Sequence, residues 1–379
     1  MTTTEPITDP AQPATPEDAA TQLGERLLTD AVRAMELLSV ALGAELGLYH
    51  ALAGGAADAR TLAERAGIHP RYAREWLEQQ AVAGLLQAPP GGAGEADPYT
   101  REFTLPEGHR RTLVDPDDPG YLGTLPSFIA SFATVLTELA TAYRTGGGVP
   151  YQAYGELTRH GIAGMNRPMF RDQLAGWLAA LPDVRERLAT GPARVLDLGC
   201  GTGSSSIAIA ELFPRVRVHG VDLDHASVAD AEAGARRHGV ADRVSFQHAD
   251  ATTLAGSDGS DGSDGYQLVC LFEALHDMAD PVAALRAARD LLAPGGAVLV
   301  GDERVAEQFT APGDLVERLN YGFSVLHCLP ATRAEGTAAE AGTVLRPDTV
   351  REYAAKAGYT CTVLPVEHDL WRFYRLDPA

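Results

Sequence analysis

The sequence predicts a helical first half and an α/β second half. From about residue 193 onward, short apolar runs alternate with helical segments, the pattern of a doubly wound parallel sheet with helices on both faces. A glycine-rich turn at 199–203 follows the first apolar run and predicts close approach of the backbone to a ligand. Before residue 190 the apolar residues recur mostly with helical spacing.

A chain of 379 residues is longer than one ordinary domain. We expect a disordered tail over 1–20, a helical winged-helix dimerisation domain over 21–118, a helical linker or lid over 119–190 and a ligand-binding α/β domain over 191–379. The tail has neither the basic start nor the apolar stretch of a signal peptide.

The composition limits the partners and the compartment. Lys and Arg number 31 against 51 Asp and Glu, a net charge of −20, which weighs against a nucleic acid partner because phosphate binding needs a basic surface. No apolar run reaches the roughly 18 residues of a membrane span, so we expect no membrane partner. The four cysteines are scattered without a C-x-x-C pair, which predicts reduced thiols in a cytoplasmic protein.

Residues 21–53 are apolar on more than one helical face. A helix of this kind must be covered. The cover that we expect is a second copy of the chain, so the segment predicts a homodimer.

A helix-turn-helix pattern over 58–86 is followed by two β-like pieces at 99–105 and 111–114. Together they predict a winged helix, a fold that often binds DNA. The second helix carries Glu75 and Glu78, which would repel phosphate. We therefore favour a role in dimerisation or as a substrate lid.

The middle of the chain predicts helices near 125–143 and 169–188. Between them, 146–155 combines glycine with tyrosine and could either close over a ligand or connect the helices, and 161–168 predicts a further turn. Four side chains here and on a later helix are candidate substrate contacts: Tyr151, Tyr154, Met165 and Phe323.

The second half predicts seven strands, at 194–198, 216–222, 244–248, 266–271, 297–302, 359–365 and 371–376. Helices are expected at about 204–212, 225–238, 280–292, 313–328 and 347–357. The Gly/Ser/Asp repeat at 256–265 predicts a flexible surface loop and lacks the twelfth-position Glu of a calcium loop. Ligands of such sheets bind beyond the carboxyl ends of the strands.

Acidic residues stand near the ends of the first three strands. Asp197 precedes the glycine turn, Asp222 ends the second strand 25 residues later, and Asp250 follows the third. An acid at the second position is placed to accept from both hydroxyls of a ribose, and Asp250 can accept from an adenine amino group. Ser206 replaces the third glycine of a dinucleotide fingerprint, which argues against a pyrophosphate cradle.

These motifs resemble the class I S-adenosylmethionine (SAM) methyltransferases over about residues 190–376. The resemblance implies a Rossmann-like domain that binds SAM, with glycines along the methionine part. It also implies that Asp222 and its neighbour hold the ribose, and that Asp250 and its neighbour flank the adenine. The full set of cofactor-binding candidates is Asp197, Gly199, Gly201, Gly203, Asp222, Leu223, Asp250, Ala251 and Phe272.

The first half narrows the resemblance. A dimerising helix and a winged helix before a SAM domain are similar to small-molecule methyltransferases of secondary metabolism. Stretches such as 161–168, 275–281 and 325–330 resemble an actinobacterial group of SAM-dependent methyltransferases. The chain is similar both to α-keto acid C-methyltransferases and to small-molecule O-methyltransferases, so the methylated atom stays open.

His276 and Asp277 follow the fourth strand, where this fold places its methyl acceptor. In the O-methyltransferases that the chain resembles, a His of a His–Asp pair here is the general base. His276 could therefore deprotonate a hydroxyl while Asp277 or another carboxylate orients its ring. A packing or helix-capping role is the alternative.

His327 lies 51 residues further on, among apolar residues. It could be a core residue, but the C-methyltransferases that the chain resembles hold a divalent metal with a His pair at similar places. His276 and His327 could then bind Zn²⁺ or Fe²⁺, which would grip a keto acid and stabilise its enolate. Asp302 and Glu303 are further candidates as ligand or base. The second His favours metal-assisted C-methylation.

Two other classes of protein stay open. A SAM-binding transcription regulator could use the winged helix, although the acidic charge disfavours it. An enzyme could also keep SAM for its charge while catalysing a step other than methyl transfer.

Overall fold

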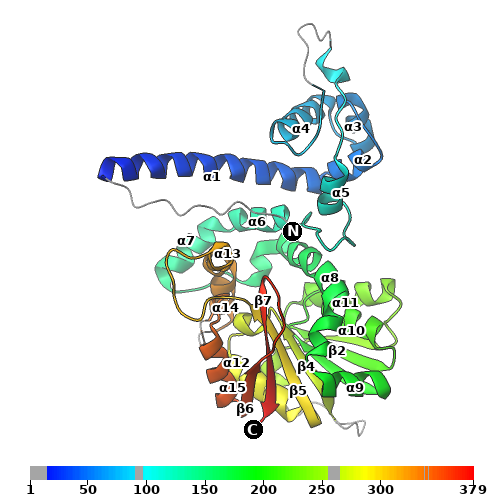
Figure 1. The fold of residues 1–379 in the computed structure, drawn as a ribbon, viewed down its shortest axis with the longest axis vertical. Helices are drawn as coiled ribbons and strands as arrows, with labels where there is room; N and C mark the ends of the chain where they lie inside the picture. The colour runs from blue at the N-terminus through cyan, green and yellow to red at the C-terminus, as the bar shows by residue number, and fades with distance from the viewer. Residues whose placement is uncertain (1–14, 90–96, 255–264, 337, 340) are drawn as a thin grey trace. The chain divides into compact units, whose positions relative to one another are not determined.

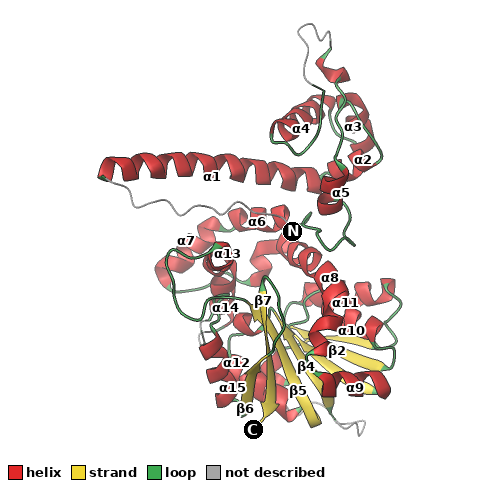
Figure 2. Cartoon of the chain, in the orientation of Figure 1, coloured by secondary structure: helices red, strands yellow, loops and turns green. Residues whose placement is uncertain are grey.

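The computed structural model describes residues 15–89, 97–254, 265–336, 338–339 and 341–379. It divides into two compact units, Met1–Val114 and Asp115–Ala379, whose elements are drawn in Figures 1 and 2. Most of the tail expected at 1–20 and of the Gly/Ser/Asp repeat at 256–265 lies outside the described residues.

The first unit is helical. Its elements are α1 (Pro16–Glu45), α2 (Leu48–Ala53), α3 (Ala59–Ala66), α4 (Pro70–Val82), η1 (Pro98–Thr100) and α5 (Glu107–Leu113). The prediction of one continuous helix over 21–53 is wrong, because Gly47, with a φ of 66°, separates α1 from α2. α1 also begins earlier than expected, because the Thr15 side chain caps its first turn by accepting from the Asp18 N–H.

Only part of the predicted wing forms. The first β-like piece makes two isolated bridges, Ala57 with Phe103 and Gln87 with Thr104. The second piece, 111–114, is wrong because most of it lies in α5. Opposite charges three residues apart favour this helix, since Arg110 lies 2.7 Å from Glu107. The described part of the first unit therefore lacks the hairpin of a DNA-reading winged helix.

α1 leaves a long row of large apolar side chains exposed. Near its carboxyl end Val40, Ala41 and Gly43 are buried. Eight other side chains along the helix and just after it are 41–70% exposed: Leu23, Leu27, Leu28, Val32, Met35, Leu38, Leu42 and Leu46. An apolar surface of this extent is typical of an interface.

The second unit begins with helices α6 (Leu125–Thr134), α7 (Leu136–Thr145), η2 (Tyr151–Tyr154), α8 (Gly155–Ala179) and α9 (Pro182–Thr190). The prediction of one helix over 125–143 is wrong, because the backbone of Val135 is not helical and separates α6 from α7. No single helix in the described ranges meets the length and hydropathy of a membrane span. α6 and α7 meet them only as a pair bent by 58°.

The turn expected at 161–168 is wrong, because these residues lie inside α8. A Cβ on Gly161 would lie 2.5 Å from the Phe128 Cβ of α6, and one on Gly164 would lie 2.5 Å from the Thr124 Cγ2. The glycines therefore serve close helix packing and not a turn.

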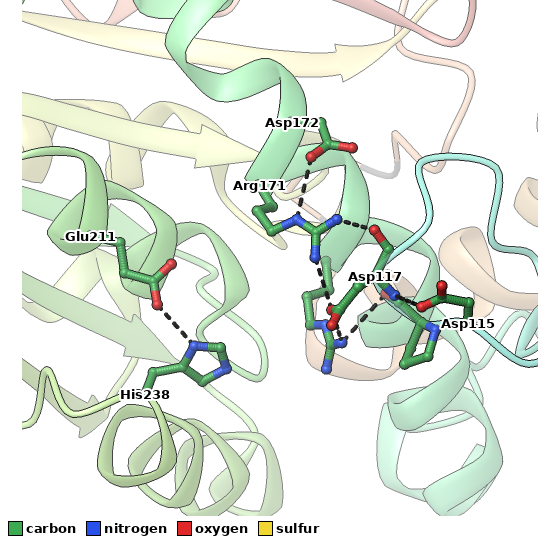
Figure 3. A network of polar contacts seen from close by, with 8 residues as sticks. Asp115, Asp117, Arg171, Asp172, Glu211 and His238 are labelled. Atoms are coloured by element: carbon green, nitrogen blue, oxygen red, sulfur yellow. Dashed lines mark hydrogen bonds and ion pairs between the residues drawn. The ribbon is translucent and has the colours of Figure 1, made fainter. Parts of the chain in front are cut away.

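Salt bridges tie the start of this unit to α8 (Figure 3). The Asp117 Oδ1 lies 2.6 Å from Arg167 Nη2 and 2.9 Å from Arg171 Nη1. Nearby, His238 at the end of α11 (His225–Arg237) lies 2.9 Å from Glu211 of α10 (Ser204–Leu212). These pairs are largely exposed and therefore add little stability each.

One seven-stranded sheet forms the centre of the unit: β1 (Ala193–Leu198), β2 (Val216–Asp222), β3 (Val244–His248), β4 (Tyr266–Phe272), β5 (Leu292–Glu303), β6 (Tyr359–Val363) and β7 (Trp371–Pro378). The order is β3-β2-β1-β4-β5-β7-β6. All seven predicted strands are confirmed. The prediction of a wholly parallel sheet is wrong for β7, which runs antiparallel to β5 and β6. The connection 364–370 between β6 and β7 is too short for the crossover that parallel strands need.

The remaining elements are η3 (Ala251–Thr253), η4 (Leu275–Asp277), α12 (Pro281–Asp290), α13 (Leu315–Phe323), the π-turn η5 (Ser324–Cys328), α14 (Leu329–Glu335) and α15 (Pro347–Lys356). Side chains alternate across the strands. Val195 belongs to a hydrophobic cluster with residues of α8, α9, α10 and α11, whereas Leu196 belongs to one with residues of α12 and α15. Figure 1 shows these helices around the sheet. The doubly wound architecture is confirmed.

The α6–α8 contact predicts opposite effects for two glycines of one helix. Gly161→Ala should destabilise the chain by about 1–3 kcal/mol through overpacking against Phe128. Gly176→Ala meets no atom within 4 Å and should stabilise it by up to about 1 kcal/mol through helix propensity. Urea denaturation followed by circular dichroism measures both. Equal effects would contradict the packing role of Gly161.

Candidate active site

A cavity of about 420 Å³ lies at the carboxyl ends of the parallel strands. It is lined by the turn after β1, by residues at the ends of β2 and β4, and by side chains of α8. All the lining residues belong to the second unit. This is the edge of the sheet at which the sequence predicts a ligand.

The turn after β1 has a backbone that favours glycine. Gly199, Gly201 and Gly203 have φ values of 70°, 51° and 79°, a region that other residues rarely adopt. Gly199 and Gly201 line the cavity. Gly203 instead precedes α10, and a Cβ there would lie 2.6 Å from the Phe246 ring.

Asp197 supports this turn from behind. It is 1% exposed, and its Oδ2 accepts hydrogen bonds from the Ser205 and Ser206 hydroxyls at 2.6 Å each. Burial raises the pKa of the carboxyl. Asp197 thus fixes the start of α10 against β1, and it is not among the residues that line the cavity.

Asp222 presents its carboxylate at the end of β2. Its Oδ2 accepts from the Gly201 N–H at 2.7 Å, and its Oδ1 accepts from the Asp224 N–H at 2.8 Å. Burial raises its pKa to about 6. A carboxylate held in this way can accept from a diol.

The structure brings most of the predicted cofactor residues together. Seven of the nine candidates line the cavity: Gly199, Gly201, Asp222, Leu223, Asp250, Ala251 and Phe272. The other two, Asp197 and Gly203, hold the turn in place.

His276 is buried behind Asp277. The ring is 2% exposed and is not among the lining residues, whereas Asp277 is. Its Nδ1 lies 2.8 Å from Asp302 Oδ1 and 3.1 Å from Glu303 Oε2, and its Nε2 lies 3.3 Å from Asp277 Oδ1. Because one N–H serves one acceptor well, Nδ1 is paired with Asp302, and Glu303 Oε2 has no hydrogen-bond partner within the described ranges.

Charge within this cluster is strongly coupled. Burial lowers the pKa of His276, but Asp277, Asp302 and Glu303 outweigh it and hold that pKa well above its usual value. Burial raises the pKa of Asp302, but His276 overcomes this and lowers it. Burial and the charge of Asp302 raise the pKa of Glu303 well above its usual value. The acids around His276 thus make its imidazole a stronger base, and burial favours the neutral form of Glu303.

His327 lies among aromatic rings. The ring centroids of Tyr154, Tyr151 and Phe132 are 4.6, 5.7 and 5.8 Å away. Burial lowers the pKa of His327 to about 4, so the ring is neutral. Its Nδ1 lies 3.4 Å from Cys328 Sγ, and its Nε2 lacks a hydrogen-bond partner among the residues that the structure describes.

The side chains that could bind a metal ion lie around His276. Two groups in the described chain place three ligand atoms close together: His276 with Asp277 and Cys328, and His276 with Asp302 and Glu303. Neither group includes His327. Burial raises the pKa of Cys328 to about 12, and a thiol that stays protonated is a poor ligand. The acids around His276 fit a cation better than the predicted pair of imidazoles does.

Of the four predicted substrate contacts, Tyr151 lines the cavity. Tyr154 is 2% exposed and donates from its hydroxyl to the Leu326 carbonyl at 2.9 Å. Met165 and Phe323 pack against the aromatic cluster around Phe128. The substrate roles of these residues stay predictions.

Glu273, Asn166 and Glu335 line the cavity, and no role was predicted for them from the sequence. Glu273 follows β4 with a φ of 48°, rare for a residue with a side chain, and accepts hydrogen bonds from Trp371 Nε1 at 3.0 Å and from Asn166 Nδ2. Burial raises the pKa of Glu273, and that of Glu335 on α14 to about 7. An acid after a strand, the signal that identified Asp222, also marks Glu273. Asn166 was hidden in the stretch that resembles a turn.

Residues 190–342 match the protein family described as a methyltransferase domain. Mouse acetylserotonin O-methyltransferase is 29% identical over 339 residues, 84% of this chain and 79% of the relative. The 27-O-demethylrifamycin SV methyltransferase of Amycolatopsis mediterranei is 32% identical over 156 residues, 40% of this chain. The chain spans 53% of that relative and 24% of an uncharacterized Synechococcus protein.

The fold has close counterparts among solved structures. Human N-acetylserotonin methyltransferase in complex with SAM superposes with a TM-score of 0.67 at 18% identity, covering 94% of this chain and 97% of that one. This likeness shows the fold, and the family match lies over the glycine turn and the acids that line the cavity. Residues 190–342 therefore match a methyltransferase domain, and the chain shares the fold of this solved methyltransferase.

Proposed function

We propose that this chain transfers the methyl group of SAM to an oxygen atom of a small molecule that binds in the cavity. Relatives named as O-methyltransferases support the oxygen acceptor. The observation that carries the proposal is the charge of the cavity wall.

The cavity wall is acidic. Seven carboxyl side chains line it: Asp222, Asp224, Asp250, Glu273, Asp277, Asp280 and Glu335. Among the described lining residues the one Lys or Arg is Arg159, which is already matched by Asp230 at 2.7 Å. Such a wall attracts the sulfonium cation of SAM and repels an anionic substrate. A neutral hydroxyl compound meets no such repulsion, whereas the carboxylate of an α-keto acid does.

The chain's own residues can take the proton from the hydroxyl. His276 and Asp277 stand together at the end of β4, with Asp277 in the cavity wall and Asp302 bound to the far side of the imidazole. In the proposed reaction the oxygen attacks the methyl carbon and the bond from that carbon to sulfur breaks. The hydroxyl proton passes by way of Asp277, which lines the cavity, to Nε2 of the unprotonated form of His276. S-adenosylhomocysteine and the methyl ether leave.

Metal-assisted C-methylation of an α-keto acid is the second candidate. Asp277 Oδ1 and Asp302 Oδ2 are buried near His276 and have no hydrogen-bond partners within the described ranges, a feature that a bound cation would explain. Such an ion would be held by His276 with these acids and would polarise a keto group. A bound cation would also neutralise part of the negative charge of the cavity wall, which otherwise repels a keto acid. C-methylation therefore requires a bound metal, whereas O-methylation does not.

Mutation and chelation distinguish the two candidates. With a panel of phenols, His276→Ala should lower the rate of S-adenosylhomocysteine formation by about 10²–10⁴-fold, and EDTA should have no effect. His327→Ala is the matched control and should change that rate much less, because His327 lies among aromatic rings. If instead only keto acids are methylated and EDTA stops turnover, the second candidate replaces the first.

The raised pKa of Asp222 predicts how the affinity for SAM depends on pH. Its carboxylate accepts best when ionised, and its pKa is about 6, so affinity for SAM should fall as the pH drops from 7.5 through 6. Asp222→Asn should weaken binding at pH 7.5 by more than about tenfold, the loss of one charge-assisted hydrogen bond.

Isothermal titration calorimetry at several pH values measures this dependence. Glu335 titrates near the same range, so the informative quantity is the difference between wild type and Asp222→Asn, which should vanish at low pH. A difference that is constant with pH would contradict the role of Asp222.

We also propose that the exposed row on α1 is covered by a second copy of the chain. Leu28, Val32 and Met35 lie on one side of the helix and are 70%, 43% and 61% exposed. Burial of such side chains stabilises each by about 1.5–3 kcal/mol. An exposed polar residue of the same helix, Arg33, provides the matched control.

Light scattering tests this dimer. The double variant Leu28→Glu/Met35→Glu should be monomeric. Arg33→Glu changes the charge by the same amount on the same helix and should stay dimeric. A double variant that remains dimeric would refute α1 as the interface.

A further inference from the structure

A second cavity lies at the opposite edge of the sheet, at the amino ends of β1, β2, β3 and β4. Its volume is about 520 Å³. Four arginines line it, Arg194, Arg215, Arg217 and Arg243, with a single acid, Asp242, in the described lining. We call it the arginine cavity.

The residues that the structure describes between β3 and β4 leave this surface uncovered. Arg194 and Arg217 are register partners on neighbouring strands and point to the same face as Leu196. A crossover helix usually covers such a face. The described part of the β3–β4 connection contains only the short turn η3, so no helix in the described ranges covers the arginines there.

Arg215 and Arg217 are exposed and bound to neutral groups. Arg215 donates to the Thr190 carbonyl at 3.2 Å, and Arg217 donates to the Asp242 carbonyl at 3.3 Å. Neither has a carboxylate partner in the described chain. A guanidinium has five N–H donors, so each of the two retains donors for a ligand.

The other lining groups are held in place. Arg243 donates to the Ala210 carbonyl at 2.8 Å and lies 3.9 Å from the Asp242 carboxylate. His219 Nδ1 lies 3.1 Å from the Tyr266 hydroxyl. The cavity thus combines fixed polar groups with two uncompensated guanidinium groups, in a chain whose net charge is −20.

We propose that the arginine cavity binds a phosphate-bearing small molecule. The planar fork of a guanidinium matches two oxygens of a phosphate, and two such forks lie two residues apart. The volume exceeds that of a phosphate ion and falls within the range of small-molecule sites. This site is independent of the methyl-transfer proposal, because it lies at the other edge of the sheet and shares no lining residue with the SAM cavity.

Calorimetric titration of the full chain with inorganic pyrophosphate tests the proposal, with ionic strength held constant by NaCl. Wild type should bind saturably. Arg215→Ala/Arg217→Ala should weaken binding by at least about tenfold. The matched control, Arg236→Ala/Arg351→Ala, removes two exposed arginines outside the cavity and should bind like wild type. Unchanged SAM binding by each variant shows that the fold is intact.

Three results would overturn the proposal. The first is no saturable binding of pyrophosphate by wild type up to about 10 mM, the range of negligible affinity. The second is equal weakening in the control variant, which would mean a general charge effect. The third is binding of malonate as tight as that of pyrophosphate, which would mean a carboxylate site.

Discussion

The contact on which the cavity at the carboxyl ends of the strands depends joins the buried Asp197 carboxylate to the hydroxyls of Ser205 and Ser206. It fixes the start of α10 against the end of β1, so the chain between them must turn within a few residues. That turn needs left-handed backbone, which glycine adopts without strain. The turn then directs the Gly201 N–H onto Asp222. Two neighbouring strand ends thereby become one binding surface.

The acidic wall has a consequence for turnover under the proposed function. Burial raises the pKa of Asp222, Glu273 and Glu335, so the negative charges are unfavourable in the empty cavity. The sulfonium of SAM relieves this, because opposite charges attract strongly where water is excluded. Methyl transfer removes the sulfonium charge. S-adenosylhomocysteine is therefore held less tightly than SAM, which favours release of the product.

The strands were predictable because strands that are buried on both faces have continuous apolar runs in the sequence. Asp222 and Asp250 were predictable because they stand at or just after the ends of such runs, where ligands of this fold bind. Gly161 shows the limit: glycine marks both turns and close helix contacts, and only the position of Phe128 decides between them. The burial of His276 behind Asp277 depends on side-chain packing. Asn166 reaches Glu273 from a distant helix, so no local pattern could reveal it.

The two edges of the sheet carry opposite charge, with acids at the carboxyl ends and arginines at the amino ends. β2 joins both cavities through Asp222 and Arg217. A strand rises about 3.3 Å per residue, so these edges are roughly 15–20 Å apart. That separation exceeds the Debye length of about 8–10 Å at physiological salt. Salt screens an anion at the amino edge on its solvent side, but screens its effect on the buried Asp222 much less along the path through the sheet. Any coupling between the two ligands would therefore act through the interior of the sheet, by charge or by the packing of the strands.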